Sequence, residues 1–315
     1  MVKTNSLKAW VLAARPKTLT GAIAPVLVGA AFAYSQSSTI AFHLSFFLCL
    51  LFAILMQIDA NLINDYFDFR KGTDREDRLG PERACAQGWI TPRAMQWGIG
   101  VMTILSCLVG LGILLLHMQW ELLIVGALCV LFCFLYTTHL SYLGWGDLLV
   151  LVFFGFVPVI FTHYVMTAGG WGIPLVIASL AMGLATDNLL MVNNYRDRHQ
   201  DKVSGKRTII VRIIEANSKR YGEVEGSQRG ERLCLHLYLW LGIIATLLAG
   251  ISLCMIASFP LLVIKLGLLL IYLLLHVKTF RQMKAFEGKA LNAVLGATAR
   301  NIFLFGLLLA VSILL

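Results

Sequence analysis

The chain has 315 residues, of which 58% are hydrophobic and only 14% are charged, and its mean hydropathy is +0.78. A soluble domain is about a quarter charged and has no means of hiding this much apolar surface, so the composition excludes a soluble globular protein and indicates a membrane protein. Its formal net charge is +9, from 26 Lys and Arg against 17 Asp and Glu.

Nine apolar segments are long enough to cross a bilayer, whose ~30 Å hydrocarbon core requires ~20 residues of helix. The first has no small-residue cleavage pattern and follows four Lys and Arg, so we expect a retained transmembrane helix rather than a signal peptide. We predict an all-α integral membrane protein with a single domain over 1–315. The predicted helices lie near 18–36, 40–63, 96–116, 120–138, 147–166, 172–192, 233–257, 260–279 and 294–315.

Basic residues are confined to a few segments. Every Lys and Arg except Lys265 precedes the first helix or lies in 64–95, 193–232 or 278–300, and nine spans place all these segments on one side of the membrane. The positive-inside rule identifies that side as cytoplasmic. We therefore expect a multi-pass protein of the bacterial cytoplasmic (inner) membrane, with its N-terminus and charged loops in the cytoplasm and its C-terminus outside. Anionic lipid headgroups or an anionic substrate suit this charge; nucleic acid does not, because no soluble basic domain is present.

Two charged segments begin with related motifs, "NDYFD" at 64–68 and "NNYRD" at 193–197. They share Asn, Tyr and Asp, and four predicted helices separate them, so both motifs lie at one membrane face as copies in a parallel internal repeat. On a helix, each motif presents one polar stripe about 100° wide. The first stripe contains Gln57, Asn61, Asn64, Asp65 and Asp68, and the second contains Asn193, Asn194, Asp197 and Asp201. Gly72 and Gly205 then end or bend the helices.

Carboxylates on two walls of a cavity repel each other unless a cation lies between them. Oxygen ligands of this kind suit Mg²⁺, which also takes water and the oxygens of a substrate phosphate. The candidate metal ligands are Asn64, Asp65, Asp68, Asn193, Asp197 and Asp201, and the four Asp among them are also the candidate catalytic residues. A solvated, salt-bridged loop is the alternative, and it stays open above all for Asp74, Glu76, Asp77 and Glu82.

Two further acids lie deeper in the predicted helices. Asp59 points away from the first stripe, and we expect it to form a hydrogen bond with a neighbouring helix. Asp187 lies at the edge of the second stripe, where either a structural or a functional role is open.

The stretches "NDYFDFRKGTD" (64–74) and "NNYRDRHQDKVSGKRT" (193–208) resemble the two Asp-rich motifs of the UbiA superfamily of intramembrane aromatic prenyltransferases. "ARPKTLTGAIAPVLVGAA" (14–31) and "YLGWGDLLVLVFFGFVPV" (142–159) support the resemblance. The wide spacing from Asn64 to Asp74 is most similar to the branch that acts on 1,4-dihydroxy-2-naphthoate. The resemblance covers the first six predicted helices and the second charged loop. Residues 211–233 match poorly, and we assign them no function.

This resemblance implies transfer of a polyprenyl group from an allylic polyprenyl diphosphate to 1,4-dihydroxy-2-naphthoate with loss of CO₂, giving demethylmenaquinol for menaquinone biosynthesis. It implies a diphosphate between two Mg²⁺ ions, one on each stripe, and an allyl cation shielded from water, with Tyr66, Tyr136, Phe153 and Phe154 as candidates along its path. The candidate diphosphate-binding residues are Arg15, Lys17, Lys71, Lys202, Lys206 and Arg207, each of which is alternatively a positive-inside anchor.

Two other functions remain as alternatives. One is a prenyltransferase for another aromatic acceptor, such as 4-hydroxybenzoate. The other is a secondary transporter, which the position of the acids at one interface disfavours, because transporters bind substrate near the bilayer midplane.

Overall fold

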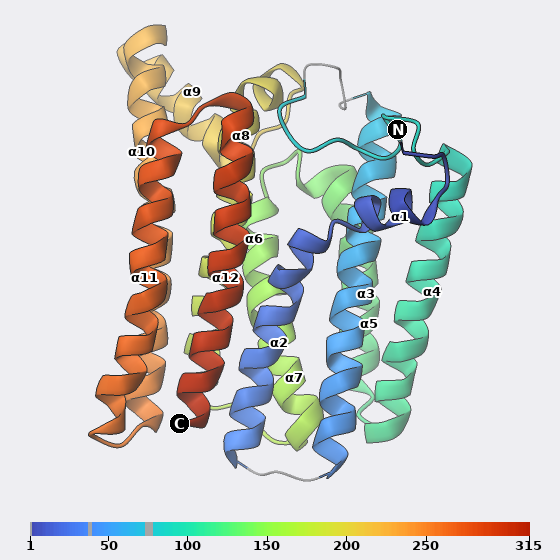
Figure 1. The fold of residues 1–315 in the computed structure, drawn as a ribbon, viewed down its shortest axis with the longest axis vertical. Coiled ribbons are helices and arrows are strands. Elements are labelled where there is room, and N and C mark those ends of the chain that lie inside the picture. The colour runs from blue at the N-terminus through green and yellow to red at the C-terminus, as the bar shows by residue number, and fades with distance from the viewer. Residues whose placement is uncertain (1, 37–39, 73–77) are drawn as a thin grey trace.

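The fold is seen in a computed structural model that describes residues 2–36, 40–72 and 78–315. Within these ranges the chain forms helices and no strand (Figure 1). The elements are α1 (Leu7–Ala14), α2 (Pro16–Gln36), α3 (Ile40–Lys71), α4 (Pro92–His117), α5 (Glu121–Leu135), η1 (Tyr136–Leu140), α6 (Gly146–Leu151), η2 (Val152–Phe156), α7 (Val157–Thr167), α8 (Ile173–Val203), α9 (Ile209–Tyr221), α10 (Glu223–Ile256), α11 (Leu261–Ala285), η3 (Gly288–Ala290) and α12 (Leu291–Leu314).

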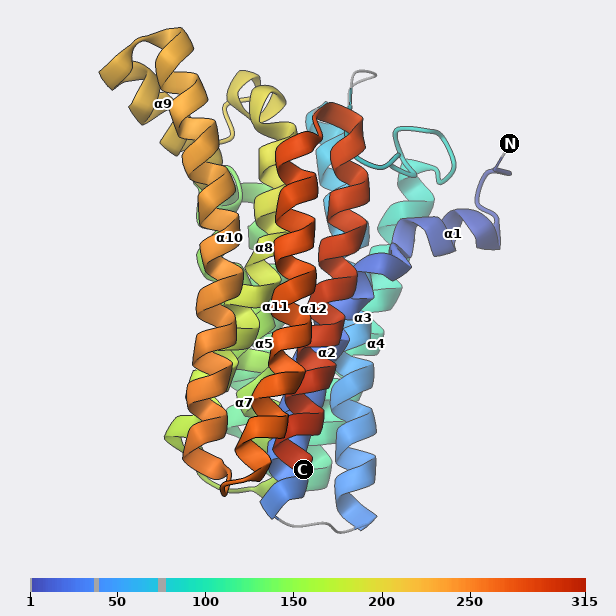
Figure 2. The ribbon, with the colours of Figure 1, turned by 60° about the vertical axis from the view of Figure 1, so that its left-hand side comes forward.

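Nine helical segments in the described part of the chain are long and apolar enough to cross a membrane, which confirms the predicted number. Seven of them are built around α2, α3, α4, α8, α10, α11 and α12. The other two are composite, because α5 continues into η1, and α6, η2 and α7 follow one another without a break. The spans run between the two ends of one bundle (Figure 2).

The helices that carry the two polar stripes are longer than a membrane requires. α3 has 32 residues and α8 has 31, so at ~1.5 Å per residue each is about 45 Å long, against a hydrocarbon core of ~30 Å. Their last turns carry the stripes, at the end of the bundle where the N-terminus lies; the C-terminus lies at the opposite end (Figure 1). Both motifs therefore lie at one face, as the repeat predicts.

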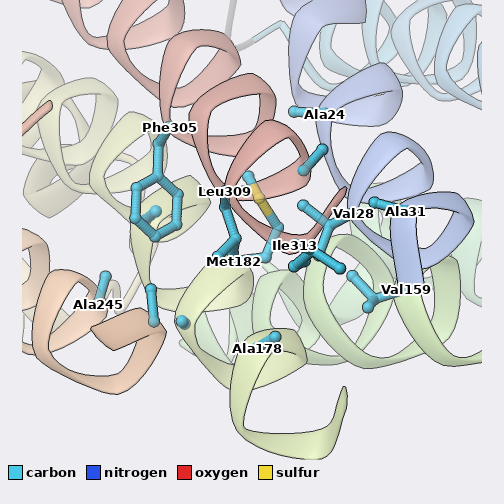
Figure 3. Packing of buried hydrophobic residues seen from close by; sticks show 14 of the residues in the cluster. Ala24, Val28, Ala31, Val159, Ala178, Met182, Ala245, Phe305, Leu309 and Ile313 are labelled. Atoms are coloured by element: carbon cyan, nitrogen blue, oxygen red, sulfur yellow. The ribbon is translucent and has the colours of Figure 1, made fainter. Parts of the chain in front are cut away.

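Small residues bring the central helices together. Ala24 and Val28 of α2 lie against α7, α8 and α12, in a core that includes Met182 and Phe305 (Figure 3). A Cβ on Gly306 of α12 would be 2.7 Å from the Ala24 Cβ, closer than two carbon atoms can approach. Small residues at such positions allow close backbone packing, which stabilises helix contacts where lipid removes the hydrophobic driving force.

The intramembrane acid Asp59 forms the predicted hydrogen bond with a neighbouring helix. Thr103 of α4 donates its hydroxyl hydrogen to Asp59 Oδ2 at 2.7 Å, and the Asp59 side chain is fully buried. This bond joins α3 to α4, and Asp59 lies outside the polar stripe of α3.

The unassigned segment 211–233 contributes most of α9 and the first turns of α10. These helices cross closely, since a Cβ on Gly230 would be 2.7 Å from the Ile214 Cα. The pair projects from the end of the bundle that carries the stripes (Figure 2). Hydropathy places the start of the seventh span near 233, but α10 begins ten residues earlier, at Glu223.

Candidate active site

A cavity of about 820 Å³ lies between α2, α3, α5, α7 and α8. Its lining changes character along α3, from Cys49, Phe52 and Met56 in the apolar segment to Asn64 and Asp68 in the stripe. Further apolar lining comes from Val26, Phe132, Phe153, Phe154, Phe161 and Val165. The cavity therefore has a charged end at the membrane face and an apolar depth.

On α3, the stripe residues Gln57, Asn61, Asn64 and Asp68 line this cavity. Asn61 donates to the Ala14 carbonyl and to Thr18 Oγ1, both at 2.9 Å, and so fixes the junction of α1 and α2 against α3. Arg15 lies at that junction and donates to Asn64 Oδ1 at 3.4 Å. The "ARPKT" segment is thus brought directly to the first stripe.

Asp65 lies outside the cavity lining, although the sequence places it in the stripe. Its side chain is 1% exposed, and its two carboxylate oxygens accept the backbone N–H groups of Ala84 at 2.9 Å and Cys85 at 3.0 Å. A carboxylate that accepts two backbone N–H groups is strongly fixed in place. Asp65 therefore anchors the loop between α3 and α4. Its neighbour Asp68 faces the cavity, with Oδ2 at 3.3 Å from Arg83 Nη2.

On α8, all four stripe residues line the cavity: Asn193, Asn194, Asp197 and Asp201. Asp197 accepts a two-pronged contact from Arg196, at 2.8 Å from Nε and 2.7 Å from Nη2. Asp201 Oδ1 is 3.8 Å from Lys206 Nζ, while its buried Oδ2 has no hydrogen-bond partner among the described residues. The structure therefore brings the two stripes to the same cavity.

Three of the six predicted diphosphate-binding residues line the cavity, namely Arg15, Lys71 and Lys206. The others do not. Lys17 is exposed on α2, Lys202 borders a separate cavity of about 220 Å³ near α9, and Arg207 is exposed beyond α8.

The structure adds two bases that the sequence analysis missed. Arg78 and Arg83 line the cavity, although they follow Asp68 by ten and fifteen residues. They return because the loop turns back on Asp65, and the Gly80–Pro81 pair is the sequence signal of that turn.

Aromatic side chains form part of the cavity wall. Tyr136, Phe153 and Phe154 line the cavity as predicted. Tyr66 does not, because its hydroxyl accepts a hydrogen bond from Gln96 at 2.7 Å on the other side of α3.

The oxygen-rich end fits a magnesium ion by donor type. Asn64, Asp68, Asn193, Asp197 and Asp201 offer carboxylate and amide oxygens, and Asp201 Oδ2 is buried without a partner in the described part of the chain. No three His, Cys, Asp or Glu side chains converge on one metal position in the ranges described. Mg²⁺ takes few carboxylates and completes its shell with water and phosphate oxygens. Asp74, Glu76 and Asp77 lie outside the described residues.

Comparisons with known proteins identify the family of the chain. A model of the UbiA prenyltransferase family matches residues 22–293. The chain is 36% identical over 242 residues to 1,4-dihydroxy-2-naphthoate octaprenyltransferase of Escherichia coli, covering 73% of this chain and 76% of that protein. It is also 36% identical over 217 residues to the Mycobacterium tuberculosis protein of the same name, with 68% and 73% covered.

Among solved structures, the fold is similar to a UbiA homologue from Archaeoglobus fulgidus bound to DMAPP and Mg²⁺. The TM-score is 0.57 at 16% sequence identity, and the match covers 96% of this chain and 99% of that one. With two Asp stripes on one cavity and the family model spanning most of the residues, the chain belongs to the UbiA prenyltransferase family.

Proposed function

We propose that the protein transfers a polyprenyl group from an allylic polyprenyl diphosphate to 1,4-dihydroxy-2-naphthoate, with loss of CO₂. The observation that carries this proposal is that Asp68 of α3 and Asp197 and Asp201 of α8 line the same cavity, together with apolar side chains. The naphthoate acceptor is supported by the relatives that bear its name.

The charged end of the cavity suits a diphosphate. Among the described residues, three carboxylates line it against five Lys and Arg side chains, so this described part of the lining carries an excess of two positive charges. The five are Arg15, Lys71, Arg78, Arg83 and Lys206. Lys and Arg are the residues that bind phosphate oxygens, and Arg does so with paired donors.

Two groups of residues are the candidates to hold magnesium: Asn64 with Asp68 on α3, and Asn193 with Asp197 and Asp201 on α8. When bound there, Mg²⁺ neutralises charge that builds up on the departing diphosphate. We propose that Asp65 contributes by fixing the loop that carries Arg83, since its carboxylate lies outside the cavity lining and accepts two backbone N–H groups of that loop.

The reaction breaks the bond between the allylic carbon and the diphosphate oxygen, and the electron pair leaves with the diphosphate. The electron-rich ring carbon that bears the carboxylate attacks the resulting allyl cation. The bond to the carboxyl carbon then breaks, its electrons restore the aromatic ring, and CO₂ departs. Phe153, Phe154 and Tyr136 line the same cavity, and we propose that their aromatic faces stabilise the cation while the apolar wall keeps water from capturing it.

Carboxyl-labelled acceptors test the reaction directly. Purified protein receives an all-trans polyprenyl diphosphate, Mg²⁺ and either 1,4-dihydroxy-2-naphthoate or 4-hydroxybenzoate, each carrying carbon-14 in its carboxyl group. We expect a prenylated naphthoquinol without label and one labelled CO₂ for each prenyl group transferred. Prenylated 4-hydroxybenzoate keeps its carboxyl and hence its label. Labelled lipid from 4-hydroxybenzoate with no product from naphthoate would refute the acceptor, and no lipid product from either would refute prenyl transfer.

A further inference from the structure

Arg196 is a fully buried arginine inside the second motif, with 1% of its surface exposed. Its guanidinium donates four hydrogen bonds: two to Asp197, one from Nη2 to Asn193 Oδ1 at 2.7 Å, and one from Nη1 to Asn292 Oδ1 at 2.8 Å. Burying a guanidinium is costly unless its donors are paired. These pairs include two of the candidate metal ligands, so Arg196 determines where their oxygens lie.

The same guanidinium supports the loop that follows the first motif. Asn292 of α12 accepts from Arg196 and donates through Nδ2 to the Leu79 carbonyl at 2.8 Å. At the next residue, a Cβ on Gly80 would lie 2.7 Å from Arg196 Nη2, so only glycine fits beside the arginine as it is held here. The loop that brings Arg78 and Arg83 to the cavity therefore rests on a residue of the other motif.

We propose that Arg196 is a positioning residue that couples the two motifs: it orients Asn193 and Asp197 and, through Asn292 and Gly80, seats the loop that carries Arg78 and Arg83. The part that concerns metal rests on the function proposed above. Each oxygen that accepts from Arg196 has a second lone pair, which stays available to a cation. Residues that orient metal ligands in this way typically change metal affinity about 10- to 100-fold when they are replaced. Lysine is a poor substitute, because it lacks the planar fork.

Neighbouring residues supply matched variants. Arg196→Lys keeps the charge and removes the fork. Arg198→Lys is its control, because Arg198 is also buried on α8 but pairs with Glu231 at 2.9 Å, away from the cavity lining. Asn292→Ala breaks the bridge to the loop and leaves the contact with Asp197 in place. Gly80→Ala displaces the Arg196 guanidinium without changing Arg196 itself. Its control is Gly100→Ala, because an added Cβ at Gly100 meets nothing within 4 Å.

Two measurements on the purified full-length protein do not depend on enzymatic turnover. The first is the affinity for Mn²⁺ in the presence of inorganic diphosphate, followed by electron paramagnetic resonance. The second is the rate at which trypsin cuts after Arg78 and Arg83 without ligand. We expect Arg196→Lys to weaken Mn²⁺ binding about tenfold or more and to speed cleavage. Gly80→Ala should change both in the same direction. Asn292→Ala should speed cleavage alone, and both controls should match the wild type.

The outcomes separate this proposal from the proposed function. Wild-type affinity and cleavage in both Arg196→Lys and Gly80→Ala would overturn the coupling, whatever the acceptor is. Equal losses in Arg198→Lys would also overturn it, because they would reflect general loss of folding. If the wild type fails to prenylate naphthoate while the variants behave as expected, the acceptor assignment fails and the role of Arg196 stands.

Discussion

Replacing Asp65 with Asn separates a loop anchor from a metal ligand. The carboxylate is almost completely buried and accepts the N–H groups of Ala84 and Cys85 at 2.9 and 3.0 Å. Asparagine keeps the shape and one acceptor oxygen, but its amide NH₂ group would face the other backbone N–H. A buried donor left without its acceptor costs about 1–3 kcal/mol, and more where the lost acceptor is charged. Arg15 is partly exposed at 3.9 Å, so its ion pair adds little.

We therefore expect Asp65→Asn to lower the free energy of unfolding by about 2–3 kcal/mol. The matched control is Asp68→Asn. Its carboxylate is 17% exposed and forms an ion pair with Arg83 at 3.3 Å; because it is less buried than Asp65, the stability change should be smaller. Denaturation of the purified protein in mixed micelles measures the stability, and Mn²⁺ binding with inorganic diphosphate measures the site. Asp68→Asn should lose Mn²⁺ affinity without a matching loss of stability. An Asp65→Asn protein as stable as the wild type but unable to bind Mn²⁺ would show that Asp65 is a metal ligand and refute the anchor.

Three further outcomes are expected. Asp68→Asn and Asp197→Asn should each lower turnover at least about 100-fold, and EDTA should abolish activity until Mg²⁺ is restored; near-normal activity in either variant would make the stripes a surface feature. In a Cys-depleted protein, a single Cys at position 206 should react only with reagent on the cytoplasmic side, because the basic segments lie at that end, and labelling from outside would contradict the orientation. Thr103→Val should destabilise the protein by about 1–3 kcal/mol because Asp59 Oδ2 loses its donor, whereas Thr103→Ser should not; equal stability of the two variants would count against the bond.

Hydropathy was sufficient to predict nine spans, because each span must bring its own apolar residues to lipid. It was a poor guide to where the helices stop. The predicted ends at 63 and 192 fall short of Lys71 and Val203, where α3 and α8 end. Hydropathy measures the free energy of transfer of side chains into lipid. A helix continues beyond the lipid wherever side chains and loops supply partners for its polar groups. The stripes occupy these additional turns.

The candidate carboxylates could be predicted from helical period, but their individual partners could not. Asp65 and Asp68 are one turn apart, yet only the fold of the distant loop places one on backbone N–H groups and the other in the cavity. The partners of long basic side chains are harder still to predict. Lys71 follows the stripe directly but turns to the Thr138 carbonyl at 2.7 Å, whereas Arg83 returns from fifteen residues away to contact Asp68.

The pairing of charge in this cavity gives a physical reason for the proposed use of a metal alongside the basic residues. Arg83 contacts Asp68 and Lys206 lies 3.8 Å from Asp201, so much of the positive charge is already opposite a carboxylate. When such bases turn to a diphosphate, they leave carboxylates that are partly buried and unpaired, which is costly. A divalent cation bound there would neutralise carboxylate and phosphate oxygens at once. We infer that the acids at the ends of α3 and α8 pair with bases in the free protein and with metal when the diphosphate is bound.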